Sequence, residues 1–167
     1  MKTKKTIGFD AIFALEQAVL NQGQWEEEWT DLVPYNHIRK SPVLLYEYAM
    51  HQYRSGCLES AESALTEAVR KSAEMSLQRL FQISFACLTR LKLRTGDVAA
   101  AEIGLRFLAD ECDHEPDDIQ GEVLLALAAG AHLLKKHESR AEYYRRAIQS
   151  FARSGNMLSM VRALLDR

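Results

Sequence analysis

Apolar residues recur along this chain at intervals of three and four, the spacing of one face of an α-helix. The stretch from Met75 to Thr95 shows the pattern clearly. Its stripe consists of Leu77, Leu80, Phe81, Phe85, Leu88 and Leu91, with Ile83 and Leu93 beside it. Gly96 comes next and predicts the end of the helix, because helices often end at a residue with positive φ. Asp97 is then expected to cap a second helix.

The same order of residues repeats. The dipeptide Ala-Glu begins at Ala61, Ala101 and Ala141, which are 40 residues apart. Gly56 and Gly96 stand five residues before the first two alanines, and Lys136 stands before the third. A glycine that makes a tight turn, followed by a small residue that lets two helices approach, is typical of helix hairpins.

The predicted fold is therefore all-α, a stack of antiparallel helix hairpins with about nine helices. Residues 1–7 form a basic tail, and one domain covers 8–167, with units at about 8–33, 42–72, 75–112 and 116–154 and a final helix at 156–167. Pro42 is expected to open a helix, and Tyr35–Ser41 to connect the first two units. The final helix either caps the stack or leads into a natural chain that continues past Arg167.

Composition narrows the classes of protein. The sequence is 47% hydrophobic and 26% charged, which excludes a disordered chain. A net charge of -2 argues against nucleic acid as a direct partner. The apolar run Val123–Leu134 is shorter than the roughly 20 residues that span a bilayer. Three widely spaced cysteines, without a CxxC motif, favour free thiols in a reducing compartment, so a cytoplasmic protein without membrane association is expected.

The segment Asp110–Asp118 offers carboxylates, Cys112 and His114 within nine residues. It is a candidate for metal binding, but its spacing fits neither an EF-hand loop nor a zinc pair. A solvated turn before the helix at Pro116 is the favoured interpretation. No catalytic motif or phosphate loop is present, so we expect no enzyme activity, no metal and no cofactor. Several arginines after Glu138 are assigned to a solvated outer face: Arg140, Arg145, Arg146 and Arg153.

Two stretches, Leu45–Ala68 and Phe85–Leu105, resemble the tetratricopeptide repeat (TPR) through their turn glycines, Gly56 and Gly96, and their small alanines, Ala61 and Ala101. The resemblance covers about residues 8–155 and implies a right-handed superhelical α-solenoid. A TPR has about 34 residues. The 40-residue period is similar to the repeats of MalT-type, LuxR-family bacterial transcription regulators. That similarity implies the sensor or interaction part of a larger regulator.

In such repeats the first helix of each pair lines the concave side, where ligands bind. The resemblance places eight principal residues of this chain in a groove for a protein or peptide: Tyr46, Met50, Tyr53, Arg54, Arg90, Leu93, Arg94 and Leu133. Further groove positions fall at Phe13, Gln17, Ala86, Ala126, Gly130 and Leu134. Arginine suits carboxylates, and tyrosine and methionine give adaptable apolar contact, so an acidic or C-terminal peptide is the expected ligand.

Packing between helices is the competing role for the apolar members of this set, Met50, Leu93 and Leu133. The alternative function is structural: the end helices associate to form a homodimer without a separate ligand. Trp25, Trp29 and the apolar final helix motivate this alternative.

Overall fold

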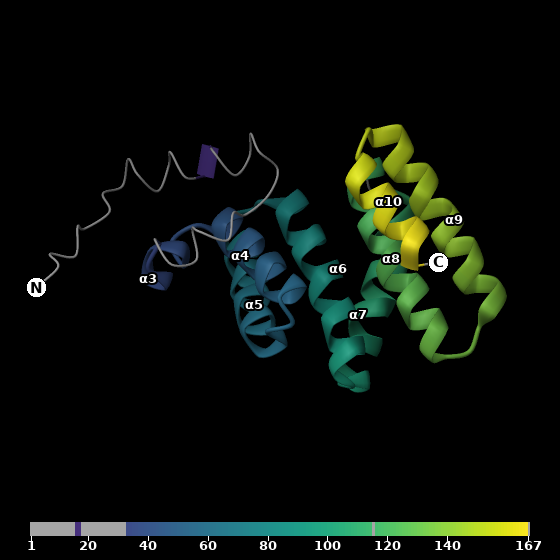
Figure 1. Cartoon of the computed structure of the whole chain (residues 1–167), viewed down its shortest axis with the longest axis horizontal. Helices are drawn as coiled ribbons and strands as arrows, with labels where there is room; N and C mark the ends of the chain where they lie inside the picture. Colours follow the sequence, from purple (N-terminus) through teal and green to yellow (C-terminus); the bar gives the residue numbers. More distant parts are fainter. Residues whose placement is uncertain (1–15, 18–32, 115, 167) are drawn as a thin grey trace, which may run out of the picture. The chain divides into compact units, whose positions relative to one another are not determined.

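The computed structural model describes residues 16–17, 33–114 and 116–166, and within these ranges the regular structure is helical, without strands. This confirms the all-α prediction. The helices are α3 (Tyr35–Ile38), α4 (Pro42–Arg54), α5 (Leu58–Glu74), α6 (Gln78–Thr95), α7 (Val98–Glu111), the short 3-10 helix η1 (Cys112–His114), α8 (Asp117–Leu133), α9 (His137–Ser154) and α10 (Met157–Asp166) (Figure 1). The predicted tail and most of the predicted unit at 8–33, including Phe13, Trp25 and Trp29, lie outside the described residues.

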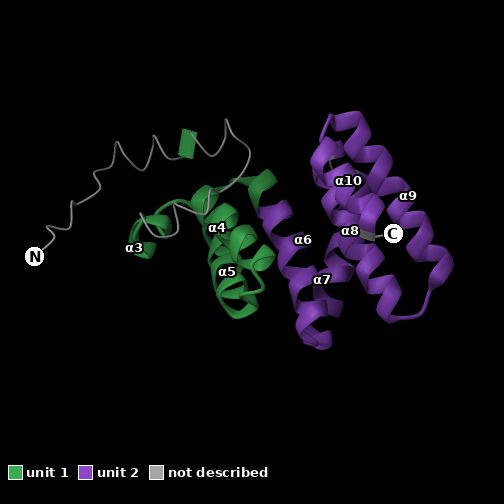
Figure 2. Cartoon of the chain, viewed as in Figure 1, with its two compact units in different colours: residues 1–80 green, residues 81–167 purple. Residues whose placement is uncertain are grey.

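The chain divides into two compact units, residues 1–80 and 81–167 (Figure 2). In unit 1, α4 and α5 form an antiparallel hairpin, and α3 packs on α4. Its buried side chains include Ile38, Leu44, Leu45, Ala61, Leu65 and Ala68. The segment Tyr35–Ser41, expected to be a plain connection, therefore contains one turn of helix with a buried end.

In unit 2, α8 is the central helix. The six residues Val123–Ala128 are all buried, so α8 is covered on every side at its middle. Helices α7 and α9 pack against it, and α10 packs against α9 (Figure 1). The long apolar run in the sequence is thus the core of this unit. Among the described residues, no helix combines the length and the hydropathy that a bilayer-spanning segment needs.

The turns share one geometry. At the end of α4 the Gly56 N–H donates to the Tyr53 carbonyl (3.2 Å) and the Cys57 N–H donates to the Gln52 carbonyl (2.9 Å). These two bonds define a Schellman motif, in which the turn residue must have positive φ. The same pair of bonds surrounds each positive-φ residue of the described chain: Gly56, Ser76, Gly96, Lys135 and Gly155.

Capping residues fix the starts of two helices. Pro42 occupies the first turn of α4, and the Ser41 hydroxyl accepts a hydrogen bond from the Leu44 N–H at 3.2 Å. At α7 the Asp97 carboxylate accepts from the Ala100 N–H at 3.4 Å. Both caps satisfy an amide that has no partner within the helix. The predicted helix starts at Pro42 and after Asp97 are therefore confirmed.

The third hairpin departs from the 40-residue period. Ala61 and Ala101 are buried, as expected of close-contact positions, but Ala141 is exposed. The third turn residue is Lys135, with φ 55°, while Lys136 has an ordinary φ of -88°. Gly56 and Gly96 are 40 residues apart, but Gly96 and Lys135 are 39 apart. The assignment of Ala141 as a close-contact alanine was wrong by one residue.

With this one-residue shift the third hairpin becomes regular. Tyr144 then corresponds to Leu65 and Leu105, and it is 8% exposed. Arg140 takes the place of the close-contact alanine, and its guanidinium carbon lies 5.5 Å from the centroid of the Tyr144 ring. The period breaks because the connection from α7 to α8 contains η1 and Pro116 instead of a Schellman turn.

Two helical glycines allow close packing in unit 2. A Cβ atom on Gly121 of α8 would overlap the ring of Phe151, which is fully buried on α9. A Cβ atom on Gly104 of α7 would overlap the side chain of Thr89 on α6. These positions bring the helices together, as the turn alanines do elsewhere.

Replacing Lys135 by glycine is expected to raise the free energy of unfolding by about 0.5–1 kcal/mol, since a side chain at positive φ is strained. Urea denaturation measures the change. Lys136→Gly is the matched control, because its φ is negative and glycine there adds only flexibility. A stability gain from Lys136→Gly with a loss from Lys135→Gly would contradict the assigned turn.

Gly121→Ala is expected to lower the free energy of unfolding by about 1–3 kcal/mol, because the added methyl group meets the Phe151 ring. In a Phe151→Leu background the same substitution should cost less. A double-mutant cycle by urea denaturation measures this coupling. Stabilisation by Gly121→Ala in the wild-type background, as helix propensity alone predicts, would refute the steric contact.

Candidate functional site

Four predicted groove residues lie on α4 in unit 1. Tyr46, Met50, Tyr53 and Arg54 are spaced by four, three and one, which places them on one side of the helix. The buried Leu44 and Leu45 lie on another side of α4, and the buried Ala49 borders the face, three residues after Tyr46 and four before Tyr53. Tyr46, Met50 and Tyr53 are half-buried and Arg54 is exposed. The four side chains thus form one partly accessible face, which we call the α4 face.

The other four predicted residues belong to unit 2. Arg90 on α6 forms an ion pair with Glu122 on α8, at 3.1 Å, and both side chains are largely buried. The Ser159 hydroxyl on α10 donates to the same Glu122 carboxylate at 3.3 Å. Glu122 therefore ties α6 and α10 to the central helix, and Arg90 is engaged within the protein.

The remaining groove positions of unit 2 differ in exposure. Leu93 is half-buried, Arg94 is exposed, and Leu133 and Leu134 are 50% and 56% exposed. Three neighbouring positions that the resemblance also placed in the groove are buried: Ala86, Ala126 and Gly130. A Cβ atom on Gly130 would meet Leu105 of α7, so this position faces a helix. Their assignment to a ligand-facing groove was wrong, because all three are buried: Ala86 within α6, Ala126 in the covered middle of α8, and Gly130 against Leu105.

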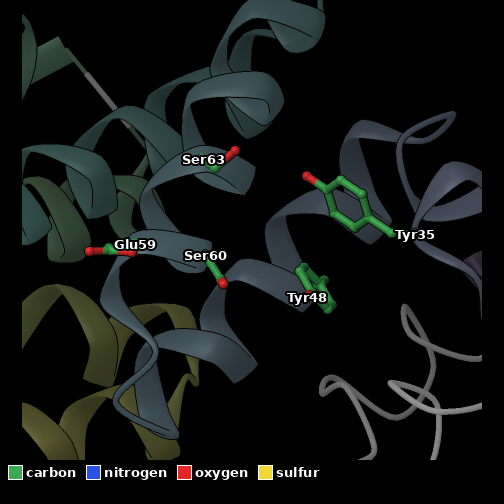
Figure 3. Close-up of a pocket in the computed structure, with 5 residues that line it drawn as sticks. All are labelled: Tyr35, Tyr48, Glu59, Ser60 and Ser63. Carbon is green, nitrogen blue, oxygen red and sulfur yellow. The ribbon is translucent and has the colours of Figure 1, made fainter.

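A cavity of about 370 Å³ lies in unit 1 between α3, α4 and α5. Five residues line it: Tyr35, Tyr48, Glu59, Ser60 and Ser63 (Figure 3). The two tyrosine rings have centroids 5.4 Å apart and are inclined at 51°. Figure 3 shows them on one side of the cavity, with the three α5 residues along the other. This site could not be predicted from the sequence, since its residues come from three helices and Tyr35 lies in a segment expected to be a connection.

The polar surface of α5 extends beyond this cavity. A second hollow of about 300 Å³ is lined by Glu59, Glu62, Ser63 and Thr66. Carboxylates and hydroxyls at this spacing share one side of the helix. The combined lining is rich in hydrogen-bond acceptors beside two aromatic rings, which suits a group that donates hydrogen bonds or carries positive charge.

The environment of the two tyrosines favours their neutral form. Burial, with a smaller contribution from Glu67, raises the pKa of Tyr35 above its ordinary value of 10.0. Burial also raises the pKa of Tyr48, with Cys57 adding to the effect. Glu67 in turn pairs with Arg39 at 3.0 Å. The phenols therefore remain hydrogen-bond donors across the neutral range.

Acidic residues before and at the start of α8 pair with arginines of α9. Arg146 pairs with Asp113 and Arg153 with Asp117, each at 2.6 Å. The hydrogen bond from Arg153 holds the pKa of Asp117 below its usual value. Within the described residues no three His, Cys, Asp or Glu side chains gather as a metal site would require. Arg146 and Arg153, expected on a solvated face, thus attach α9 to η1 and to the start of α8.

Comparison with known proteins adds no relative: no protein-family model, no curated protein and no solved structure matches this chain.

The raised pKa values of Tyr35 and Tyr48 predict a loss of stability in alkali. Their contribution is fully present below about pH 10 and is lost as pH rises through the folded-state pKa values, since the unfolded chain then releases protons more readily. A chain with Tyr35→Phe and Tyr48→Phe should lose stability less steeply as pH rises above about 10. Urea denaturation at several pH values measures the slope, with Tyr143→Phe as the control. An unchanged slope in the double variant would contradict the role of burial.

Proposed function

We propose that this chain is a non-enzymatic scaffold that binds a protein or peptide segment on the α4 face. The regular turns support the proposal, because repeated helix hairpins present the first helix of each pair to a ligand. The resemblance to tetratricopeptide repeats remains part of the proposal, as do the superhelical stack and a cytoplasmic role in a larger bacterial transcription regulator.

The observation that carries the proposal is the composition of the α4 face. Two tyrosines and a methionine are partly accessible on the side of α4 that faces away from its buried leucines. Aromatic side chains and methionine are enriched where proteins meet, because they give a large contact area and adapt to a partner.

Arg54 gives the α4 face its expected charge preference. It lies in the last turn of α4, is exposed, and forms no ion pair with any residue in the described part of the chain. A guanidinium group binds a carboxylate through two parallel hydrogen bonds, which a lysine cannot reproduce. An acidic side chain or a C-terminal carboxylate is therefore the ligand group that we assign to Arg54. Arg90 is left out of the contact set, since Glu122 already holds it.

The ligand is tested with a displayed library of random peptides that have free C-termini, selected on the purified chain. Selected peptides should be acidic near one end, and their affinity, measured by fluorescence anisotropy, should fall at least about tenfold in Arg54→Ala and in Tyr53→Ala. Arg54→Lys should recover only part of the loss, because the paired hydrogen bonds are missing.

Arg70→Ala is the matched control. Arg70 is an arginine on another helix, α5; its side chain is 55% exposed and pairs with Glu74. Its loss should leave peptide affinity unchanged. The proposal fails if the selected peptides bind Arg54→Ala and Tyr53→Ala as they bind the wild-type chain, or if selection returns no binding peptide.

A further inference from the structure

Helix α10 carries an exposed apolar stripe. Its members are Met157, Leu158, Val161, Leu164 and Leu165, and each is between 46% and 82% exposed. The intervals of one, four, seven and eight from Met157 place them on one side of the helix. A helix side that faces water is normally polar, and this stripe is apolar along its whole length.

The side of α10 opposite the stripe packs on the core of unit 2, so the stripe faces outward. Ala163 is fully buried, Ser159 is 7% exposed, and Met160 packs on the core of unit 2. The Asn156 side chain caps the helix by accepting from the Ser159 N–H at 3.1 Å, and the Ser159 hydroxyl reaches Glu122 at 3.3 Å. Rotating the helix to hide its stripe would break these contacts, so the apolar side cannot turn inward without loss.

The stripe is large enough to form half of a specific interface. Its five side chains expose on the order of 500 Å² of apolar surface, which is near the largest patch that an ordinary monomer leaves in water. Two copies together would bury roughly 1,000 Å², the lower limit for a stable contact between proteins. The stripe contains no charged residue; Arg162 lies at its edge.

The order of residues in the stripe identifies its occupant. The stripe is symmetric about Val161: Met157 and Leu165 are each four residues from it, and Leu158 and Leu164 are each three residues from it. In an antiparallel pair around a twofold axis at Val161, each apolar residue meets an apolar residue of the other copy, as an isologous interface requires. Met157, Val161 and Leu164 also have the four-three spacing of a coiled-coil seam.

We propose that this chain forms a homodimer in which the α10 helices of two copies pack antiparallel, with the two Val161 side chains on the twofold axis. The dimer goes beyond peptide binding, because it uses a different unit of the chain and leaves the α4 face of each copy separate. A dimer would present two α4 faces, so that a partner with two acidic segments would bind more tightly than a partner with one.

The first test is the mass of the whole 167-residue chain, by light scattering and sedimentation over a range of concentrations. The expected result is a dimer that dissociates on dilution. Val161→Asp should give a monomer with unchanged helical circular dichroism, because a buried unpaired charge at the axis opposes association. Ile103→Asp is the matched control: Ile103 is an apolar residue of α7 that is 71% exposed and lies outside the stripe, so this variant should remain dimeric.

Cysteine cross-linking then tests the orientation, in a chain whose exposed Cys57 is replaced by serine. Val161→Cys should form a disulfide-linked dimer on oxidation, since both copies place residue 161 at the axis. Leu158→Cys alone should not, but a mixture of Leu158→Cys and Leu164→Cys chains should cross-link to each other. A parallel pair would instead cross-link through Leu158→Cys alone.

Three results would overturn the proposal. One is a wild-type chain that stays monomeric at the highest concentration reached, which would assign the stripe to another occupant. Another is a dimer that persists in Val161→Asp. The third is cross-linking by Leu158→Cys alone. Because none of these readouts involves a peptide, failure of the dimer and failure of peptide binding on the α4 face are separable.

Discussion

The constraint on which this structure depends is the residue with positive φ after a helix. At each such position the backbone reverses within two residues, and two hydrogen bonds satisfy carbonyls that the helix leaves without partners. Because the reversal is tight, its position determines which side chains of the next helix face inward. After each of the five turns the next helix begins two residues later. The turn residues are Gly56, Ser76, Gly96, Lys135 and Gly155, and the helices begin at Leu58, Gln78, Val98, His137 and Met157.

The sequence predicted much of this arrangement where the turn residue is glycine. Gly56 and Gly96, together with the stripes of apolar residues, predicted the ends of α4 and α6 and the buried faces of α5 and α7. The prediction of the turn position failed at Lys135, where the turn residue is not a glycine. Lys135 has no special signature, since any residue can be forced to positive φ when the surrounding hydrogen bonds outweigh a strain of about 1–2 kcal/mol. The Ala-Glu dipeptide then suggested a register that is one residue too long.

The features of the candidate site also fall into those that the sequence could predict and those that it could not. The α4 face could be predicted because helical spacing alone puts its residues on one side. The engagement of Arg90 could not, because its partner Glu122 is 32 residues away on another helix. The cavity beside Tyr35 and Tyr48 depends on a one-turn helix that periodicity cannot detect. The burial of Ala126 and Gly130 follows from the central position of α8, which depends on how many helices surround it.

The helices of unit 2 differ in where their apolar residues lie. This difference connects the packing of the core with the proposed association of two copies. The middle of helix α8 buries its apolar residues on every side, whereas α10 exposes a stripe of five large ones. The hydrogen bond from Ser159 to Glu122 joins these two helices, and the ion pair with Arg90 of α6 holds the same carboxylate, so Glu122 orients the surface that we assign to the second copy. The buried core of unit 2 thereby determines which side of α10 is available for association.

Backbone NMR tests the central claim about the turns most directly. Chemical shifts and coupling constants report φ at each residue, and amide exchange reports the hydrogen bond donated by the residue that follows each turn. The account predicts positive φ at Gly56, Ser76, Gly96, Lys135 and Gly155, with slow exchange of the Lys136 amide because it donates to the Ala131 carbonyl. Positive φ at Lys136 and helical φ at Lys135 would contradict it, because the third hairpin would then keep the 40-residue period and bury Ala141.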